Sequence, residues 1–217
     1  METILDTAKI IGTALAEFVL MIYFCKQYID KNSDRINIGK GVKEQSEISK
    51  EIIDTMDYYK ELLHADRILL FEFHNGQHYS NYRSALKMSV SHEVYKASLS
   101  SVREKCSGLP IAVMPHFVAA ITNDGQTFCR DLEDIKGKMG SSYEFKKSLG
   151  IKSFYDVAIR DAEGNTIGFV AVQWNTVMPD DIDTQNILKL AGYLESSIKK
   201  LVQSDRKNKR EKVSLFK

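Results

Sequence analysis

The stretch RILLFEFHNGQHYS at residues 67–80 decides the fold. Residues 68–73 are rich in aliphatic and aromatic side chains, which is typical of a buried strand. Asn75-Gly76 follows, and this pair predicts a tight turn because both residues tolerate positive φ. The polar side chains from His74 onward therefore lie at the rim of a sheet, where ligands often bind.

The bulk composition suits one globular domain with appendages. The chain has 217 residues, with 30 Lys and Arg against 29 Asp and Glu, so its overall charge gives no argument for a nucleic-acid-binding protein. Its three cysteines form no CxxC pair, which indicates neither a disulfide framework nor a zinc knuckle. We therefore expect the main domain to lie in a reducing compartment.

The segment at residues 10–25, IIGTALAEFVLMIYFC, is apolar apart from Glu17. With its flanks it approaches the ~20 residues that cross a bilayer. We therefore predict that residues 1–29 form a single transmembrane anchor. Lys26, Lys31 and Arg35 follow the segment, so the positive-inside rule places the N-terminus outside and the main domain in the cytoplasm. The alternative is a helix whose apolar face pairs with a partner chain.

A polar segment with two glycines, residues 30–41, predicts a linker. From Val42 onward, apolar residues recur at steps of three and four, which predicts a helix as far as Leu63. This helix packs on the sheet, and we expect it to pair with its copy in a homodimer as well.

The rest of the chain predicts an antiparallel sheet with helices at both ends of the sequence, an α+β fold. Alternation and turn residues predict the second strand at residues 84–91. A helical or irregular stretch follows at residues 92–105, and then a short helix at residues 113–121. A short strand follows at residues 126–130 and a short helix at residues 141–149. The next two strands, residues 152–160 and 166–175, form a hairpin, and the final helix covers residues 179–203.

Three phrases in this order resemble a GAF domain. They are TFCRD at residues 127–131, LGIKSFYDVAIRD at 149–161 and GNTIGFVAVQW at 164–174. The positions that match the family's pattern are Gly150, Ile151, Ser153, Ile167 and Gly168. The resemblance covers residues 42–203, the predicted GAF-like domain. FHNG at residues 73–76 also resembles GAF-like proteins of bacteriophages and bacteria.

The resemblance implies a sensor or regulatory module that binds a small molecule and dimerises. In the family, the pocket lies between the sheet and an insert that caps it, here residues 92–121. The implied ligand-binding residues are Phe73, Asn75, Tyr79, Tyr82, Met88, Ser91, His92 and Phe117. The cyclic-nucleotide signature and a bilin-attachment cysteine beside a histidine are both absent from the sequence. The identity of the ligand, and of any cofactor, therefore stays open.

Other chemistry is less well founded in the sequence. His74, His78 and His92 are possible metal ligands by type, but their spacing does not bring them together, so we expect no metal site. Cys106 and Cys129 suggest a cysteine-dependent GAF-fold reductase as an alternative. The nucleophile elbow, the Walker loop and the HExxH motif are missing from the sequence, so we expect no enzyme.

The C-terminal residues 204–217 form a basic tail. Its charges suit phosphates or anionic lipid. A membrane-tethered scaffold that contacts nucleic acid, or a larger assembly, through this tail is therefore an alternative function. A solvated, disordered tail is the simpler expectation.

Overall fold

The computed structural model describes the backbone of residues 2–78, 82 and 84–214, and the side chains of these residues except 2–11, 13–14, 29–40 and 205–214. The chain divides into two units. Residues 1–46 and 203–217 make up one unit, and residues 47–202 make up the other. The larger unit holds the sheet, and each unit is described by itself below.

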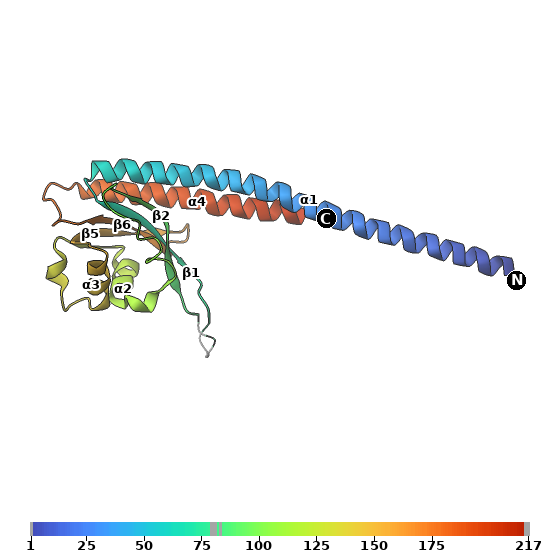
Figure 1. Ribbon diagram of the computed structural model, residues 1–217, viewed down its shortest axis with the longest axis horizontal. Helices are drawn as coiled ribbons and strands as arrows, with labels where there is room; N and C mark the ends of the chain where they lie inside the picture. Colours follow the sequence, from blue (N-terminus) through green and yellow to red (C-terminus); the bar gives the residue numbers. More distant parts are fainter. Residues whose placement is uncertain (1, 79–81, 83, 215–217) are drawn as a thin grey trace. The chain divides into compact units, whose positions relative to one another are not determined.

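The elements follow the predicted order (Figure 1). The strands are β1 (Arg67–His74), β2 (Lys87–Tyr95), β3 (Leu109–Pro110), β4 (Gln126–Cys129), β5 (Ser153–Arg160) and β6 (Thr166–Trp174). The α-helices are α1 (Glu2–Leu62), α2 (Pro115–Asp124), α3 (Ser141–Ser148) and α4 (Thr184–Ser214). Two short 3₁₀ helices are η1 (Ile111–Val113) and η2 (Leu132–Ile135).

The strands form one antiparallel sheet in the order β3-β2-β1-β6-β5-β4. The predicted antiparallel α+β architecture is confirmed. β1 lies between β2 and β6, so the opening stretch supplies a central strand. Buried central strands are apolar on both faces, which explains the unbroken run at its start.

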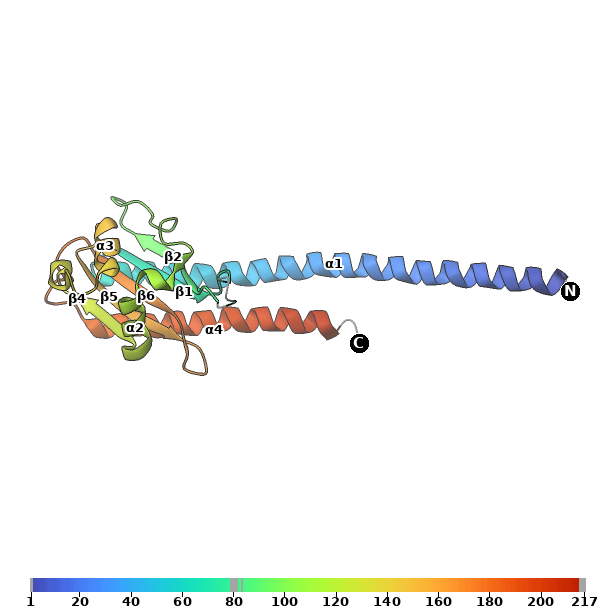
Figure 2. The same ribbon diagram turned by 90° about the horizontal axis from the view of Figure 1, so that it is seen from below.

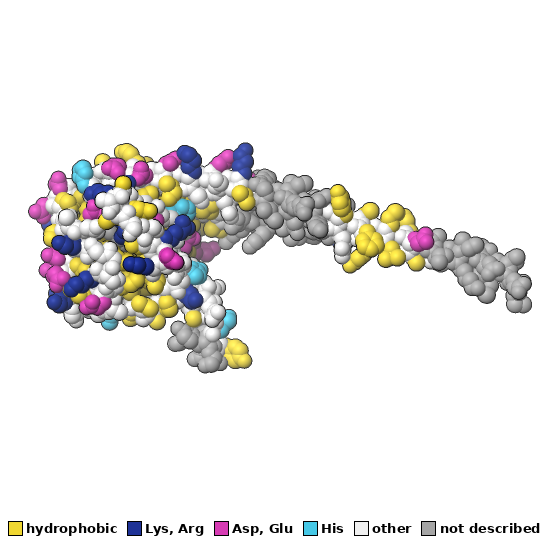
Figure 3. All heavy atoms as spheres, viewed as in Figure 1, with side chains coloured by type: hydrophobic (Ala, Val, Ile, Leu, Met, Phe, Trp, Pro, Cys, Tyr) yellow, Lys and Arg dark blue, Asp and Glu magenta, His cyan; other side chains and the backbone are white. Residues whose placement is uncertain are grey.

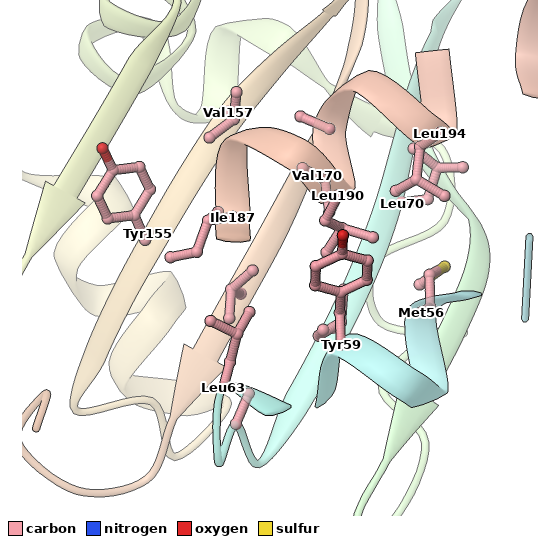
Figure 4. Packing of buried hydrophobic residues seen from close by; sticks show 14 of the residues in the cluster. Met56, Tyr59, Leu63, Leu70, Tyr155, Val157, Val170, Ile187, Leu190 and Leu194 are labelled. Atoms are coloured by element: carbon pink, nitrogen blue, oxygen red, sulfur yellow. The ribbon is translucent and has the colours of Figure 1, made fainter. Parts of the chain in front are cut away.

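Helices cover both faces of the sheet within the larger unit, with α1 and α4 on one face and α2 and α3 on the other (Figures 1 and 2). The α1/α4 face buries alternate strand residues against the two helices. Met56 and Tyr59 of α1 meet Leu190 and Leu194 of α4 over the strands (Figure 4). Trp174 closes one end, where its indole N–H donates to the Leu63 carbonyl at 3.2 Å.

The opposite face, which we call the insert face, packs against α2 and the loop before it. Its buried strand residues come from the other set of alternate positions, since side chains on a strand point to opposite faces in turn. They are Leu69, Phe71, Met88, Val90, Ala158, Phe169 and Ala171. The loop and α2 cover them with Val102, Cys106, Met114, Phe117 and Ile121.

The prediction of a tight turn at Asn75-Gly76 is wrong. β1 and β2 continue as an irregular ribbon beyond His74, with Ala85 N–H donating to the Gln77 carbonyl at 2.8 Å and a bridge between His78 and Ser84. A Cβ on Gly76 would lie 2.1 Å from the Ala85 carbonyl oxygen. The glycine is therefore needed for close approach of two backbones and not for a turn.

Three other expectations about local structure need correction. The second strand begins and ends later than predicted, so residues 92–95 belong to β2 and not to a helical insert. The predicted linker at 30–41 is helical within α1, and the predicted tail is helical as far as Ser214 in α4. The tail is rich in Lys, Arg and Glu, which form helices well, and the two glycines at residues 39 and 41 cost only ~1 kcal/mol each.

In the smaller unit, large apolar side chains of α1 are exposed to solvent (Figure 3). They are Leu15, Phe18, Val19, Leu20, Met21, Ile22, Tyr23, Phe24 and Tyr28. Glu17 is exposed among them. Within the part of the chain that the structure describes, we find no helical stretch of the length and hydropathy that a bilayer crossing requires. Ile10 and Ile11 of the predicted span lie outside the described side chains.

Candidate functional site

An aromatic cluster fills the space between the insert face and α2. Phe169 of β6 stacks on Phe71 of β1, with ring centroids 4.5 Å apart, and meets Phe117 of α2 edge to face at 5.1 Å. Phe73 lies 6.0 Å from the same ring. Phe169 is thus the centre of the cluster, and the rings join the sheet to α2.

A buried ion pair lies beside this cluster. The ammonium nitrogen of Lys146 on α3 is 2.8 Å from Asp156 Oδ2 on β5, and their side chains are 7% and 0% exposed. The same nitrogen lies 3.7 Å from the ring centroid of Phe154 and 4.8 Å from that of Phe117. The cation is therefore held by one carboxylate and two aromatic rings, both of which attract a desolvated ammonium.

The register of β5 and β6 explains why polar groups meet here. Asp156 pairs with Ala171, and Phe154 pairs with Gln173. Because Ala171 belongs to the insert face, Asp156 and Gln173 lie on that face too. α3 brings Lys146 over them, and it begins after Gly140 and is followed by Gly150, which have φ of 46° and 76°.

Two acceptors of this polar group have no partner within the described residues. They are Asp156 Oδ1 and Gln173 Oε1, both fully shielded from solvent. A buried acceptor without a donor costs about 1–3 kcal/mol, so each unpaired oxygen marks an unmet binding capacity. Burial raises the pKa of Asp156, and the nearby Lys146 ammonium only partly offsets this effect.

A small cavity adjoins the group. Its volume is about 20 Å³, enough for one water molecule. Its walls are Phe71, Met114, Phe117, Phe145, Lys146, Leu149, Ile151, Phe169, Ala171 and Gln173. The site thus combines apolar walls with a few convergent polar groups, which is the usual composition of a small-molecule pocket.

Three of the eight residues predicted to bind a ligand meet at this face. Phe73 pairs with Met88 across β1 and β2, and both share the insert face with Phe117. Asn75 and Tyr82 are exposed on the ribbon beyond the sheet. Tyr79 lies outside the described residues.

Ser91 and His92 lie away from the insert-face cluster. The register shifts between Leu70 and Phe71, which leaves Ser91 without a Cα partner on β1, and its hydroxyl donates to the Leu70 carbonyl. His92 then pairs with Leu70, a residue of the α1/α4 face, so the imidazole lies on that face. Burial lowers the pKa of His92, and the effect of the Glu72 carboxylate opposes this shift.

The cysteines lack the properties of a reactive pair. Cys106 is fully buried, and burial raises its thiol pKa to about 11. Burial also raises the pKa of Cys129. A thiol with a raised pKa holds little thiolate at neutral pH, and the thiolate is the nucleophile. The structure therefore offers no support for the reductase alternative.

The described residues hold no group of three or more His, Cys, Asp or Glu side chains placed to bind a metal ion. A shallow apolar groove of about 640 Å³ lies elsewhere on the larger unit, along α2 and the segment that leads into β2. Its walls are Ser84, Leu86, Ile111, Ala112, Pro115, Val118, Ala119 and Thr122. None of the eight predicted ligand-binding residues lines it.

Sequence reasoning missed Lys146, Asp156 and Gln173. One signal was available for the acid, since Asp156 interrupts the otherwise apolar run of β5. Carboxylates are almost never fully buried unless they are paired, so an acid in such a strand demands a cation nearby. The sequence does not show that this cation is Lys146 and not its neighbour Lys147.

Solved structures confirm the GAF-like fold. One similar structure is GAF3 of Slr1393 from Synechocystis sp. PCC6803, which matches with a TM-score of 0.56 and 15% identity, over 73% of this chain and 98% of that one. The cyanobacteriochrome receptor PixJ matches with a TM-score of 0.55 and 15% identity, over 73% of this chain and 99% of that one. A phycoerythrobilin-bound GAF domain from a cyanobacterial phytochrome matches with a TM-score of 0.54 and 13% identity, over 81% of this chain and 97% of that one. No family model and no curated protein matches the chain. Because the sequence identities are low, these matches show that the chain is similar to GAF domains in fold.

Proposed function

We propose that this chain is a GAF-like sensor or regulatory module that binds a small molecule between the insert face of the sheet and the α2–α3 region. The observation that carries the proposal is the buried group of Lys146, Asp156 and Gln173. It places a cation and two unpaired acceptors beside apolar walls. A module that only needed a packed core would gain stability from apolar residues at these positions.

The fold supports this placement. The similar structures are photoreceptor GAF domains, and one of them is bound to phycoerythrobilin. A bilin does not suit this site, because a cavity of about 20 Å³ is far below the ~300–1,000 Å³ that larger ligands occupy. The ligand we propose is small, and it opens the site as it binds.

The output we propose is a change in the helices on the other face. β5 and β6 carry insert-face and α1/α4-face residues in alternation, so movement of a strand on one side reaches the other. The outer surfaces of α1 and α4 expose Tyr58, Leu62, Leu188 and Tyr193. We propose that these residues form the interface of a homodimer, since exposed apolar patches often mark protein contacts.

The attachment we propose is to a membrane through residues 10–25, with the larger unit on the cytoplasmic side. The exposed apolar residues of α1 are consecutive, from Phe18 to Phe24, and therefore occupy every side of the helix. One partner helix covers only one side, whereas lipid covers all of them. Deletion of residues 1–29 is expected to move the protein from the membrane fraction to the supernatant.

Native mass spectrometry of the full-length protein, purified in detergent from its expression host, tests the proposal. We expect a bound molecule of low mass and a dimer, with the dimer lost in a Tyr58→Glu, Tyr193→Glu variant. The matched control is Phe128→Glu, since Phe128 is exposed to a similar extent on the edge strand β4. The sensor proposal fails if neither host metabolites nor a small-molecule library bind the folded protein at the insert face.

A further inference from the structure

The side chain of Lys146 is held as a bound ligand would be held. Its ammonium lies 2.8 Å from one carboxylate and over two aromatic rings, and its alkyl chain is buried with it. In chemical terms, the lysine side chain is an n-butylammonium group tethered to α3. The cavity beside it has apolar walls apart from Lys146 itself and Gln173. Asp156 contacts the ammonium.

The site has more acceptors than the tethered ammonium uses. A primary ammonium carries three N–H donors. Among the described residues, Lys146 makes one hydrogen bond to an acceptor, Asp156 Oδ2. Asp156 Oδ1 and Gln173 Oε1 are left unpaired on the same face. A free ammonium is not constrained by α3 and is able to donate to acceptors that the tethered group does not reach.

We propose that this site binds a small primary alkylammonium ligand, and that Lys146 occupies the ammonium position when the ligand is absent. The inference rests on the proposed sensor function and names the chemical class of its ligand. The exchange replaces one ammonium with another, so Asp156 keeps a cationic partner throughout. Withdrawal of Lys146 enlarges the cavity by the space of its own side chain.

The alternative occupants are less well matched to the site. An anion would meet the Asp156 carboxylate, whose Oδ1 is unpaired, and the unpaired Oε1 of Gln173. A neutral apolar molecule would leave those acceptors unpaired, at a cost that the ammonium avoids. A single water fits the present cavity, but it does not use the aromatic faces that surround the cation.

The Lys146→Ala variant, titrated with n-butylammonium chloride, tests the site. We expect the variant to unfold at a lower temperature than the wild type, because Asp156 loses its cation, and n-butylammonium to restore part of the loss. Equal concentrations of n-butanol and of sodium chloride should not do so. The matched control is Lys147→Ala, which removes the neighbouring exposed lysine of the same helix and should respond to the amine no more than the wild type does. In the Lys146→Ala, Asp156→Asn double variant, the preference for the amine over the alcohol should disappear.

The wild-type protein gives the second test, which stays decisive if Lys146→Ala does not fold. NMR of the lysine side chains should show the Lys146 resonances shift towards solvent-exposed values as n-butylammonium is added. If both the wild type and the Lys146→Ala variant fold, the Kd for n-butylammonium should be at least about tenfold higher for the wild type, since Lys146 competes for the ammonium position. The inference would be overturned if the wild-type Lys146 resonances did not shift at amine concentrations that saturate the Lys146→Ala variant. If that variant does not fold, the same test applies up to the solubility limit of the amine. Equal responses to n-butanol would overturn the inference as well.

The two proposals fail separately. If another class of small molecule binds at the insert face while amines do not, the ammonium assignment is wrong and the sensor proposal stands. If no small molecule binds there, both are wrong.

Discussion

Truncation of Phe169 to alanine tests how the insert face is packed. The ring is 2% exposed and contacts Phe71, Phe73 and Phe117 with centroid distances of 4.5, 6.0 and 5.1 Å. Removal of a buried phenylalanine ring typically costs about 3–5 kcal/mol, and the three ring contacts place this position towards the upper end. We expect a loss of about 4 kcal/mol in the free energy of unfolding.

Urea denaturation followed by the fluorescence of Trp174 measures this loss. Trp174 is the only tryptophan and is buried on the opposite face, so its signal reports global unfolding. With a slope of about 2 kcal/mol per molar urea, the midpoint should fall by about 2 M. The control is Phe128→Ala, which removes a ring that is 56% exposed and stacked on Tyr155, and it should cost about 1 kcal/mol. A loss in Phe169→Ala no larger than in this control would refute the packing described here.

Three further predictions concern single positions. Because burial raises the pKa of Asp156, the native state keeps a proton that the unfolded chain releases, so the free energy of unfolding should fall as pH rises from the ordinary carboxyl range to the raised pKa. Asp156→Asn should remove this slope in urea melts across that range, and an unchanged slope would contradict the assignment. Iodoacetamide should alkylate the buried Cys106 far more slowly in the native protein than in the urea-unfolded protein, as read by peptide mass spectrometry, and equal rates would be inconsistent with the buried thiol. Gly168→Ala should destabilise by several kcal/mol, because its Cβ would lie 2.1 Å from a backbone oxygen of β1, whereas Gly192→Ala in α4 should stabilise by about 0.5–1 kcal/mol. A melting temperature that does not fall in Gly168→Ala, or does not rise in Gly192→Ala, would contradict the prediction for that position.

Much of the sheet could be predicted because its strands have strong local signals. β1, β5 and β6 are long apolar runs with clear ends, and the hairpin between β5 and β6 has its glycine at residue 164 with φ of 85°. The turn after β1 was predicted wrongly because Asn-Gly is a local signal. The close approach of Gly76 to Ala85 depends on pairing that no short window of sequence contains.

The site was harder to predict because its parts are distant in sequence and their meeting depends on register. A shift of the register between β1 and β2 turns His92 to the α1/α4 face, and a single-residue shift is enough to reverse a side chain. The polar centre needs α3 to place Lys146 over Asp156, a tertiary contact between a helix and a strand. The aromatic members were accessible to prediction, since Phe73 and Phe117 lie in strongly apolar segments.

The central claim is that a small molecule binds between the sheet and the α2–α3 region. Hydrogen exchange of the full-length protein, with and without the low-molecular-weight fraction of its expression host, tests this claim most directly. We predict slower exchange in Pro115–Asp124, Ser141–Ser148 and the paired strands Ser153–Arg160 and Thr166–Trp174 when the ligand is present. Exchange that is unchanged in these four segments, while the fraction protects another part of the chain, would contradict the account.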